Sequence, residues 1–333
     1  MNLHTIDWIV VGLYLAFLGF ITGGFLKRPR KDIADYLVAG RRLTLPSLIA
    51  TTVSSWYGGI LGVGEYAYKY GISMWLVFGI PYYLSAAIFA LWIADKANQS
   101  RLLTIPDQLR LIYGETVASL GAIQVFIKNV PAAYFLMLGT LAHMVLGIPL
   151  LWGVVLGALL STAYVWVGGF RGDVRTDWLQ FFLMYSVFSL MVVLLVHNYG
   201  GWEWIKKHIP PEHLVWHGGR STTYILSWYL IALGALVEPT FYQRAYAAKS
   251  PKLARKGFLW CIPFWAWFDF MTTTTGLYAR SILGPTLQGP DAFPRLGDHL
   301  LPYGVKGLFL VGLIATIQST ADSNTLVAAS AQG

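Results

Sequence analysis

Nine long apolar segments dominate this sequence of 333 residues. They cover residues 6–26, 45–67, 72–95, 117–146, 149–168, 174–197, 222–243, 257–282 and 304–329. A helix needs roughly 20 apolar residues to cross a bilayer, and each segment reaches that length. Only 12% of the residues are charged, which is too few to cover the surface of a soluble protein. The sequence therefore predicts an all-α integral membrane protein with about nine transmembrane helices.

The basic residues indicate the direction in which the chain crosses the membrane. Of its 24 Lys and Arg residues, 16 fall in the loops on one side, beginning with residues 27–31, and six fall on the other side. Cytoplasmic loops are enriched in Lys and Arg, so we expect a multi-pass cell-membrane protein with its N-terminus outside. These loops also account for the formal net charge of +8, and no nucleic-acid partner is expected. The single cysteine, Cys261, excludes an intrachain disulfide framework and a cysteine zinc cluster.

Hydroxyl and glycine residues interrupt the second apolar segment at residues 47–59. One interpretation is a helix that breaks at membrane depth and frees carbonyl oxygens, which are hard ligands suited to an alkali cation. The alternative is an intact helix packed through small residues. The ninth segment is also too polar to face lipid, because Thr316, Ser319, Thr320 and Ser323 recur on one helical face. That face either completes an oxygen cage for Na⁺ or forms hydrogen bonds between helices.

Three further features carry polar groups into or beside the apolar segments. In residues 168–180, the glycine pair predicts a turn, Thr176 is a candidate helix cap, and Asp177 is expected in the first helical turn. Residues 242–256 are basic and are interpreted on their own as a solvated loop. Lys128 lies inside a span, where a lysine either snorkels, pairs with a carboxylate or serves a function.

Four segments together resemble the sodium:solute symporter family, which includes sodium-coupled proline, sugar and pantothenate carriers. They are Asp35-Tyr36 with Gly40-Arg41, GGFRGDVRTDWLQ at 168–180, QRAYAAKSPKLARK at 243–256 and QSTADSNTL at 318–326. The resemblance runs from about residue 4 to the end of the chain.

The resemblance implies a LeuT-like inverted-repeat architecture with one extra N-terminal helix. Residues 1–333 then form a single transmembrane domain, with a leading helix at 6–26, a first five-helix repeat at 45–197 and a partial second repeat at 222–329. Members of the family continue through two further helices beyond the point that matches Gly333. We therefore expect a chain that is truncated at its C-terminus, with an incomplete second repeat.

The resemblance also implies site residues. Its sodium site matches the backbone carbonyls of Ala50, Val53 and Thr316 and the hydroxyls of Ser319 and Thr320. Residues implicated in coupling match Asp177 and Arg41. The substrate candidates are Ser54, Ser55, Trp56, Tyr57 and Glu238.

The implied function is sodium-coupled symport of a small organic solute, with Na⁺ as the coupling ion and the lipid bilayer as surroundings. The alternative is a truncated remnant or sensor module that does not transport. No nucleophile–base or metal–histidine arrangement supports an enzyme. The sugar carriers' polar pair after the helix break appears here as Trp56-Tyr57, which argues against a sugar and leaves amino acid, monocarboxylate and vitamin open. The sequence gives no indication of oligomeric state.

Overall fold

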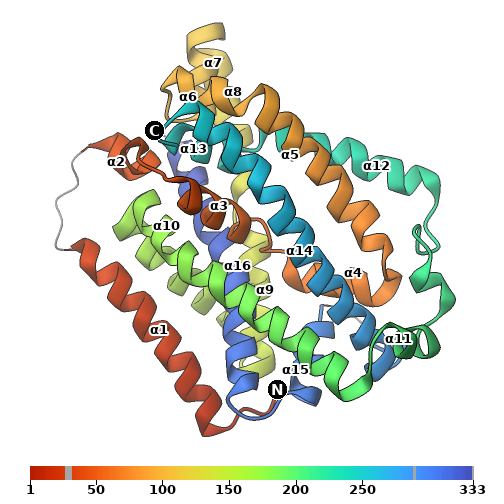
Figure 1. Cartoon of the computed structure of the whole chain (residues 1–333). Coiled ribbons are helices and arrows are strands. Elements are labelled where there is room, and N and C mark those ends of the chain that lie inside the picture. The colour runs from red at the N-terminus through yellow and green to blue at the C-terminus, as the bar shows by residue number, and fades with distance from the viewer. Residues whose placement is uncertain (27–31, 288–289, 332–333) are drawn as a thin grey trace.

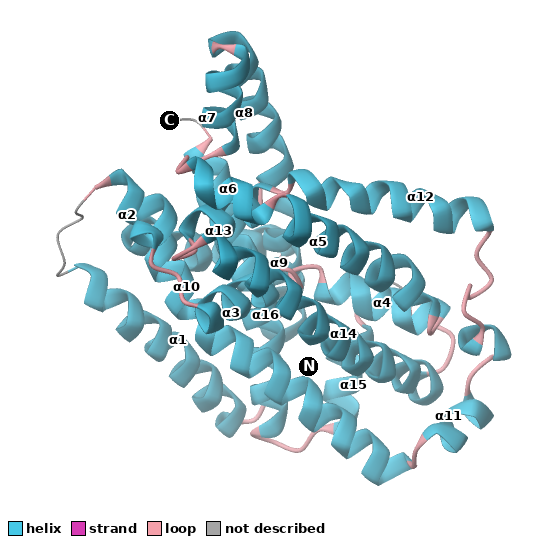
Figure 2. Cartoon of the chain, turned by 45° about the horizontal axis from the view of Figure 1, so that its top comes forward, coloured by secondary structure: helices cyan, strands magenta, loops and turns pink. Residues whose placement is uncertain are grey.

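The computed structural model describes residues 1–26, 32–287 and 290–331. Within these ranges the chain is helical, and its β-structure is limited to an isolated bridge between Leu43 and Ala248 (Figure 2). The all-α prediction is therefore confirmed. The basic residues 27–31 used to predict the orientation lie outside the described residues.

The helices run through the whole described chain (Figure 1). In order they are α1 (Thr5–Leu26), α2 (Ile33–Val38), η1 (Ala39–Arg41), α3 (Leu45–Ser54), α4 (Ile60–Tyr70), η2 (Trp75–Gly79), α5 (Ile80–Trp92), α6 (Ala94–Ser100), α7 (Ile105–Tyr113), α8 (Glu115–Asn129), α9 (Ala132–Leu146), α10 (Leu150–Tyr199), α11 (Trp202–His208), η3 (Pro211–Leu214), α12 (Thr222–Ala232), η4 (Leu233–Val237), α13 (Pro239–Ala247), α14 (Pro251–Leu283), α15 (Ala292–Leu300) and α16 (Val305–Ser330). We call the side that carries α2 and α6 the α2 face, and the opposite side, with α11 and α15, the α11 face.

The outer surface is that of a membrane protein. Four helical segments have both the length and the apolar composition to cross a membrane, namely Trp75–Trp92, Glu115–Leu146, Val165–Tyr199 and Thr222–Ala247. Large apolar side chains are also exposed, including Phe20 at 78% and Leu230 at 72%. Extended apolar surface is costly in water and stable against lipid. The chain is therefore a multi-pass membrane protein, and the count of nine spans stays a prediction.

The second predicted span is broken in the middle. Helix α3 ends at Ser54 and α4 begins at Ile60, with residues 55–59 in turns between them. The break contains Gly58 and Gly59, and glycine lowers helix propensity by about 1 kcal/mol relative to alanine. Of the two interpretations of the hydroxyl and glycine pattern, the broken helix is therefore the one observed.

The seventh predicted span is broken as well. Helix α12 tightens into the 3₁₀ turn η4, the backbone is extended at Glu238, and α13 then starts at Pro239. Proline at the first helical position needs no hydrogen bond from its missing N–H, so it favours a new helix start there. The Glu238 side chain caps this start by accepting hydrogen bonds from the N–H and hydroxyl of Thr240, at 3.5 and 3.2 Å.

Two other predicted boundaries need correction. The fourth span is interrupted at Val130-Pro131, which separates α8 from α9.

The glycine pair at residues 168–169 makes the predicted bend within α10. Gly169 has φ 55°, and an added Cβ there would lie 2.5 Å from Tyr36. The prediction that Thr176 caps a helix with Asp177 in its first turn is wrong. The helix has already resumed, and the Thr176 hydroxyl donates to the Asp173 carbonyl at 2.9 Å.

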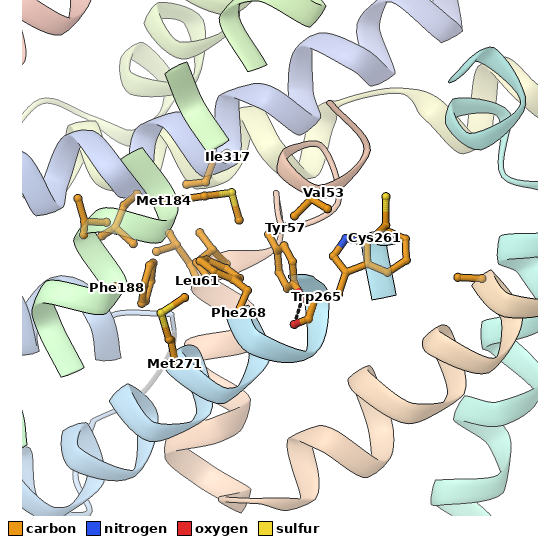
Figure 3. Close-up of a cluster of buried hydrophobic side chains, with 14 of the residues drawn as sticks. Val53, Tyr57, Leu61, Met184, Phe188, Cys261, Trp265, Phe268, Met271 and Ile317 are labelled. Carbon is orange, nitrogen blue, oxygen red and sulfur yellow. Dashed lines mark hydrogen bonds between the residues drawn. The ribbon is translucent and has the colours of Figure 1, made fainter. Parts of the chain in front are cut away.

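Helix α16 passes through the centre of the bundle (Figure 1), where it packs against α1, α3, α8, α9 and α10. Close packing against α10 needs a small residue, since a Cβ on Gly312 would lie 2.2 Å from Val187. Beside it, α3, α4, α10 and α14 contribute side chains to a tightly filled apolar core (Figure 3). Cys261 is fully buried in this core, as a small hydrophobic residue would be. The polar face of α16 is therefore buried within the bundle.

Candidate functional site

The end of α3 presents the two carbonyl groups expected to bind sodium. The Ala50 carbonyl accepts a hydrogen bond from the Ser54 hydroxyl at 2.8 Å, and the Val53 carbonyl accepts one from the Trp56 N–H at 3.3 Å. Carbonyl groups in the last turn of a helix have no continuing helical partners. A carbonyl oxygen has two lone pairs, so the Val53 carbonyl retains capacity for a cation. Ala50 lies one turn earlier, and the Ser54 hydroxyl already adds to the helical hydrogen bond on its carbonyl.

The hydroxyl groups of α16 face this break. The Ser319 hydroxyl donates to Asp177 at 2.5 Å, whereas the fully buried Thr320 hydroxyl has no hydrogen-bond partner among the described residues. The break lies directly against it, because a Cβ added to Gly58 would lie 2.4 Å from the Thr320 Cβ. Thr316 directs its own hydroxyl back along α16, so only its carbonyl remains as the predicted ligand. A buried hydroxyl without a partner is costly and fits a bound cation or water.

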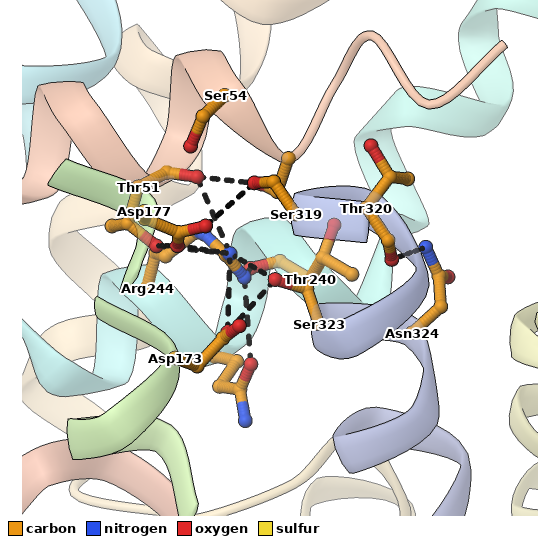
Figure 4. Close-up of polar contacts among 12 residues, drawn as sticks. Thr51, Ser54, Asp173, Asp177, Thr240, Arg244, Ser319, Thr320, Ser323 and Asn324 are labelled. Atoms are coloured by element: carbon orange, nitrogen blue, oxygen red, sulfur yellow. Dashed lines mark hydrogen bonds and ion pairs between the residues drawn. The ribbon is translucent and has the colours of Figure 1, made fainter. Parts of the chain in front are cut away.

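On the α2 side of this break, α3, α10, α13 and α16 bring six polar side chains together (Figure 4). We call them the Asp177 cluster, formed by Thr51, Asp173, Asp177, Arg244, Ser319 and Ser323. Two hydroxyl groups bridge its charges. Ser323 accepts from Arg244 at 2.7 Å and donates to Asp173 at 2.8 Å, and Thr51 accepts from Arg244 at 3.0 Å and donates to Asp177. The Arg244 guanidinium consequently stands 3.8 and 3.9 Å from the two carboxylates.

Arg244 is the main residue of this cluster that the sequence did not identify. The interpretation of residues 242–256 as a solvated loop is wrong at this position, since Arg244 is fully buried and belongs to α13. The sequence signal that could have identified Arg244 is its place in QRAYAAKSPKLARK, one of the four segments that resemble the family. The cluster's charged groups are Asp173, Asp177 and Arg244, so its formal net charge is −1.

Arg41 lies apart from the Asp177 cluster, near the α2 face. Its guanidinium donates to the carbonyl groups of Arg101 at 2.6 Å, Leu102 at 3.2 Å and Tyr246 at 3.1 Å. These three carbonyls belong to the segment after α6 and to α13. Arg41 therefore ties the η1 segment to two other parts of the chain and makes no direct contact with the predicted sodium ligands.

A cavity of about 590 Å³ opens beside the two helix breaks. Four of the predicted substrate residues line it, namely Ser55, Trp56, Tyr57 and Glu238. Ser54 does not line it, because its hydroxyl points back to the Ala50 carbonyl. Thr320 also lines the cavity, which places the solute space next to the predicted sodium ligands. A volume of several hundred Å³ is typical of sites for small organic molecules.

Two charged groups of this cavity lie where helices are interrupted, Glu238 at the start of α13 and Lys128 near the end of α8. Lys128, one residue before the end of α8, forms an ion pair with Glu238 at 2.6 Å. Of the alternatives for Lys128, pairing with a carboxylate is therefore the one observed. The third charged group, Asp269 on α14, was missed from the sequence, where it stands in the aromatic run WAWFDF without a recognisable motif.

The fold and the enclosed polar site define a helical membrane transporter, and the comparisons with known proteins agree. A profile of the sodium:solute symporter family matches residues 36–332. The chain is 26% identical to the high-affinity proline transporter PutP of Bacillus subtilis, covering 93% of this chain and 69% of that protein. It is 25% identical to the sodium/pantothenate symporter of Haemophilus influenzae, covering 99% of this chain and 71% of that protein.

A solved structure of a Na⁺-coupled sialic acid symporter, in a substrate-bound outward-open state, superposes with a TM-score of 0.82 at 19% identity. The match covers 99% of this chain and 73% of that one, and it shows that the two share a fold. The chain belongs to the sodium:solute symporter family. The expectation of a transporter rather than an enzyme is thereby confirmed. The chain spans between 55% and 71% of the length of the curated relatives that it matches.

Proposed function

We propose that this chain forms the sodium- and solute-binding part of a symporter that couples Na⁺ to uptake of a small organic solute across the cell membrane. The observation that carries the proposal is the broken α3–α4 helix, which faces Ser319 and Thr320 beside a cavity of about 590 Å³. The Thr320 hydroxyl has no hydrogen-bond partner in the described part of the chain. The names of the relatives, which include sodium-coupled proline and pantothenate carriers, support symport over a non-transporting module.

The proposed sodium ligands are the carbonyls of Ala50, Val53 and Thr316 and the hydroxyls of Ser319 and Thr320. Hard oxygen ligands of this kind suit an alkali cation. Asp177 has a positioning role, because it accepts a hydrogen bond from the Ser319 hydroxyl and so leaves the lone pairs of that hydroxyl available to the ion. The Asp177 cluster also has a formal net charge of −1, which a sodium ion in the adjacent site would balance.

The proposed architecture is an inverted repeat of the LeuT type. Residues 6–26 form the leading helix, residues 45–197 the first repeat and residues 222–329 part of a second. The two breaks support this division. One lies in the first helix of each repeat, at 55–59 and at Glu238, and residues from both breaks line the same cavity. Broken helices that meet at a central site are typical of such transporters.

The proposed orientation places the N-terminus outside and the α2 face in the cytoplasm, as the distribution of Lys and Arg favours. Arg41 then holds three cytoplasmic segments together through their carbonyl groups. We propose that it couples the site to the cytoplasmic side by releasing these segments when that side opens. Its contacts support a structural latch rather than direct ion binding.

The energetics of this coupling are sufficient for solute accumulation. One charge that crosses about 100 mV yields roughly 2.3 kcal/mol. A tenfold Na⁺ gradient adds about 1.4 kcal/mol. Together these terms sustain accumulation of a neutral solute by about a few hundredfold for each sodium ion.

The sodium site can be tested without knowing the solute. We expect the purified protein in detergent to unfold at a higher temperature when NaCl replaces KCl at constant ionic strength. Saturation at 100 times the dissociation constant stabilises the folded state by about 2.7 kcal/mol. The combined substitution Ser319→Ala and Thr320→Ala should remove the sodium-dependent increase.

The matched control is Thr325→Ala with Ser330→Ala, on the same helix. Both of these hydroxyls donate to carbonyls of their own helix, at 2.7 and 2.8 Å, so they are occupied away from the break. This control should keep the full response to sodium. A protein whose unfolding temperature is the same in NaCl and KCl would refute the proposed sodium site.

A further inference from the structure

Asp269 is a buried acidic residue whose charge no described residue balances. It lies on α14, lines the cavity and is 2% exposed. Its carboxylate accepts hydrogen bonds from the Tyr57 hydroxyl at 3.0 Å and from the Tyr83 hydroxyl. It forms no ion pair with any Lys, Arg or His in the described part of the chain. A carboxylate at membrane depth costs roughly 2.5–3.5 kcal/mol on insertion scales, so it ordinarily has a function.

The two tyrosines compensate this charge only in part. The Tyr57 hydroxyl lies 3.0 Å from the Asp269 carboxylate and 2.9 Å from the Trp265 carbonyl, and it has one proton for both acceptors. Tyr83 supplies one further proton. The carboxylate therefore has unused acceptor capacity beside a cavity that is large enough for a solute.

The remaining charges of the cavity cancel each other. Lys128 and Glu238 form their own ion pair at 2.6 Å, and these two residues with Asp269 are its charged lining side chains. The formal charge of the cavity is consequently −1. An anionic solute would be repelled by Asp269, whereas a cationic one would be attracted.

Aromatic rings make up much of the cavity wall. The lining includes Trp56, Tyr57, Tyr66, Phe78, Tyr82 and Tyr134. Trp56 is held in place by Tyr82, Phe241 and Trp265, with ring centroids 5.2–5.5 Å apart. Aromatic faces attract organic cations through their quadrupoles, and the interaction is strongest when the site is desolvated.

We propose that the solute carries an ammonium group, which pairs with Asp269 and packs against the aromatic wall that includes Trp56 and Tyr57. This inference rests on the proposed function and narrows its substrate class to amine-bearing solutes, which excludes simple monocarboxylates. A bare metal ion is a poorer fit to the same site, because it would leave most of the 590 Å³ and the aromatic faces without a role.

Matched pairs of cationic and neutral compounds test the proposal on the unmodified protein. Choline and ethanolamine carry the charge, and 3,3-dimethylbutan-1-ol and propan-1-ol are their uncharged analogues of similar shape. In saturating NaCl we expect at least one of the two amines to raise the unfolding temperature and to bind at least about tenfold more tightly than its analogue. Equal effects of the amines and the alcohols, or no effect of either amine, would overturn the proposal.

Asp269→Asn tests the assigned residue. It retains one acceptor for the tyrosine hydroxyls while it removes the charge, so we expect amine binding to weaken at least about tenfold. The response to sodium alone should remain. Asp95→Asn makes the same chemical change on α6, away from the cavity, and should bind amines as the parent does.

Three outcomes separate this inference from the proposed function. Amine binding that survives in Asp269→Asn overturns the inference. Loss of the sodium response in Asp269→Asn also overturns it, since Asp269 would then be a sodium ligand. A parent protein that responds to sodium but to neither amine leaves the symporter proposal intact and refutes only the solute class.

Discussion

Replacement of Arg244 by methionine should strongly destabilise the protein, although this residue touches neither the cavity nor the predicted sodium carbonyls. Its guanidinium is the cation that faces both Asp173 and Asp177, and all three side chains are fully buried. Arg244→Met keeps much of the aliphatic volume, but it removes the cation that faces the two carboxylates and the donor to the hydroxyls of Ser323 and Thr51.

The size of the effect follows from this burial. Removing one partner of a buried ion pair costs about 3–5 kcal/mol, because the remaining charge stays away from water. For 333 residues, an unfolding entropy of about 2.1 cal/mol/K per residue corresponds to about 0.7 kcal/mol per degree. The unfolding temperature should therefore fall by about 4–7 °C.

Thermal unfolding of the purified protein in detergent measures this shift. Arg255→Met is the matched control, since Arg255 is exposed at the start of the next helix and should change stability by about 0.5 kcal/mol or less. Adding Asp173→Asn to Arg244→Met should restore part of the loss, because it removes one unpaired carboxylate. The reasoning is refuted if Arg244→Met unfolds at the same temperature as Arg255→Met, or if adding Asp173→Asn lowers the unfolding temperature further.

Two further predictions concern packing and pH. Gly58→Ala should lower the free energy of unfolding by about 1–3 kcal/mol and weaken sodium binding, because the new Cβ would lie 2.4 Å from that of Thr320. A Cβ added at Gly59 would have no neighbouring atom within 4 Å, so Gly59→Ala should change neither stability nor sodium binding. Thermal unfolding with and without sodium distinguishes the two, and equal behaviour would contradict the close approach. Burial alone would raise the pKa of Asp298, but the hydrogen bonds from Lys306, at 2.9 Å, and from the Asn2 N–H, together with the nearby positive charges of Lys306 and the N-terminus, outweigh burial and lower this pKa. A carboxyl pKa that is lowered in the folded state stabilises the fold at pH values above the ordinary carboxyl value of about 3.9. This stabilisation is lost as the pH falls through the lowered value. Asp298→Asn should therefore cost up to about 1 kcal/mol at pH 7 and progressively less as the pH falls below about 3.9, and a difference that does not change with pH would contradict the assignment.

Local properties of the chain determined its class and the position of the first break. Hydropathy over roughly 20 residues indicates a membrane helix without knowledge of its neighbours. The hydroxyl and glycine run at 47–59 likewise marked the place of the gap between α3 and α4, since helix propensity acts within a few residues, but it left an intact helix open as the alternative. The predicted face of Ser319 and Thr320 follows from helical spacing alone.

The same local signals were misleading where a distant partner decides the outcome. Arg244 has the sequence surroundings of a loop cation, yet Asp173, Thr51 and Ser323 enclose it. Lys128 allowed several interpretations until Glu238, 110 residues away, was found beside it. Thr176 has a suitable residue type for a cap, but the helix has already resumed before it.

The sequence by itself thus determined that this is a helical membrane protein, and it marked the polar run at 47–59 and the polar face of the ninth segment as unusual. Only the tertiary structure decided which charges are paired and which one is left for a ligand. Asp269 meets Tyr57 and Tyr83 across 212 and 186 residues. The physical reason is that the cost of a buried charge depends on the groups packed around it, and helices far apart in the chain supply those groups.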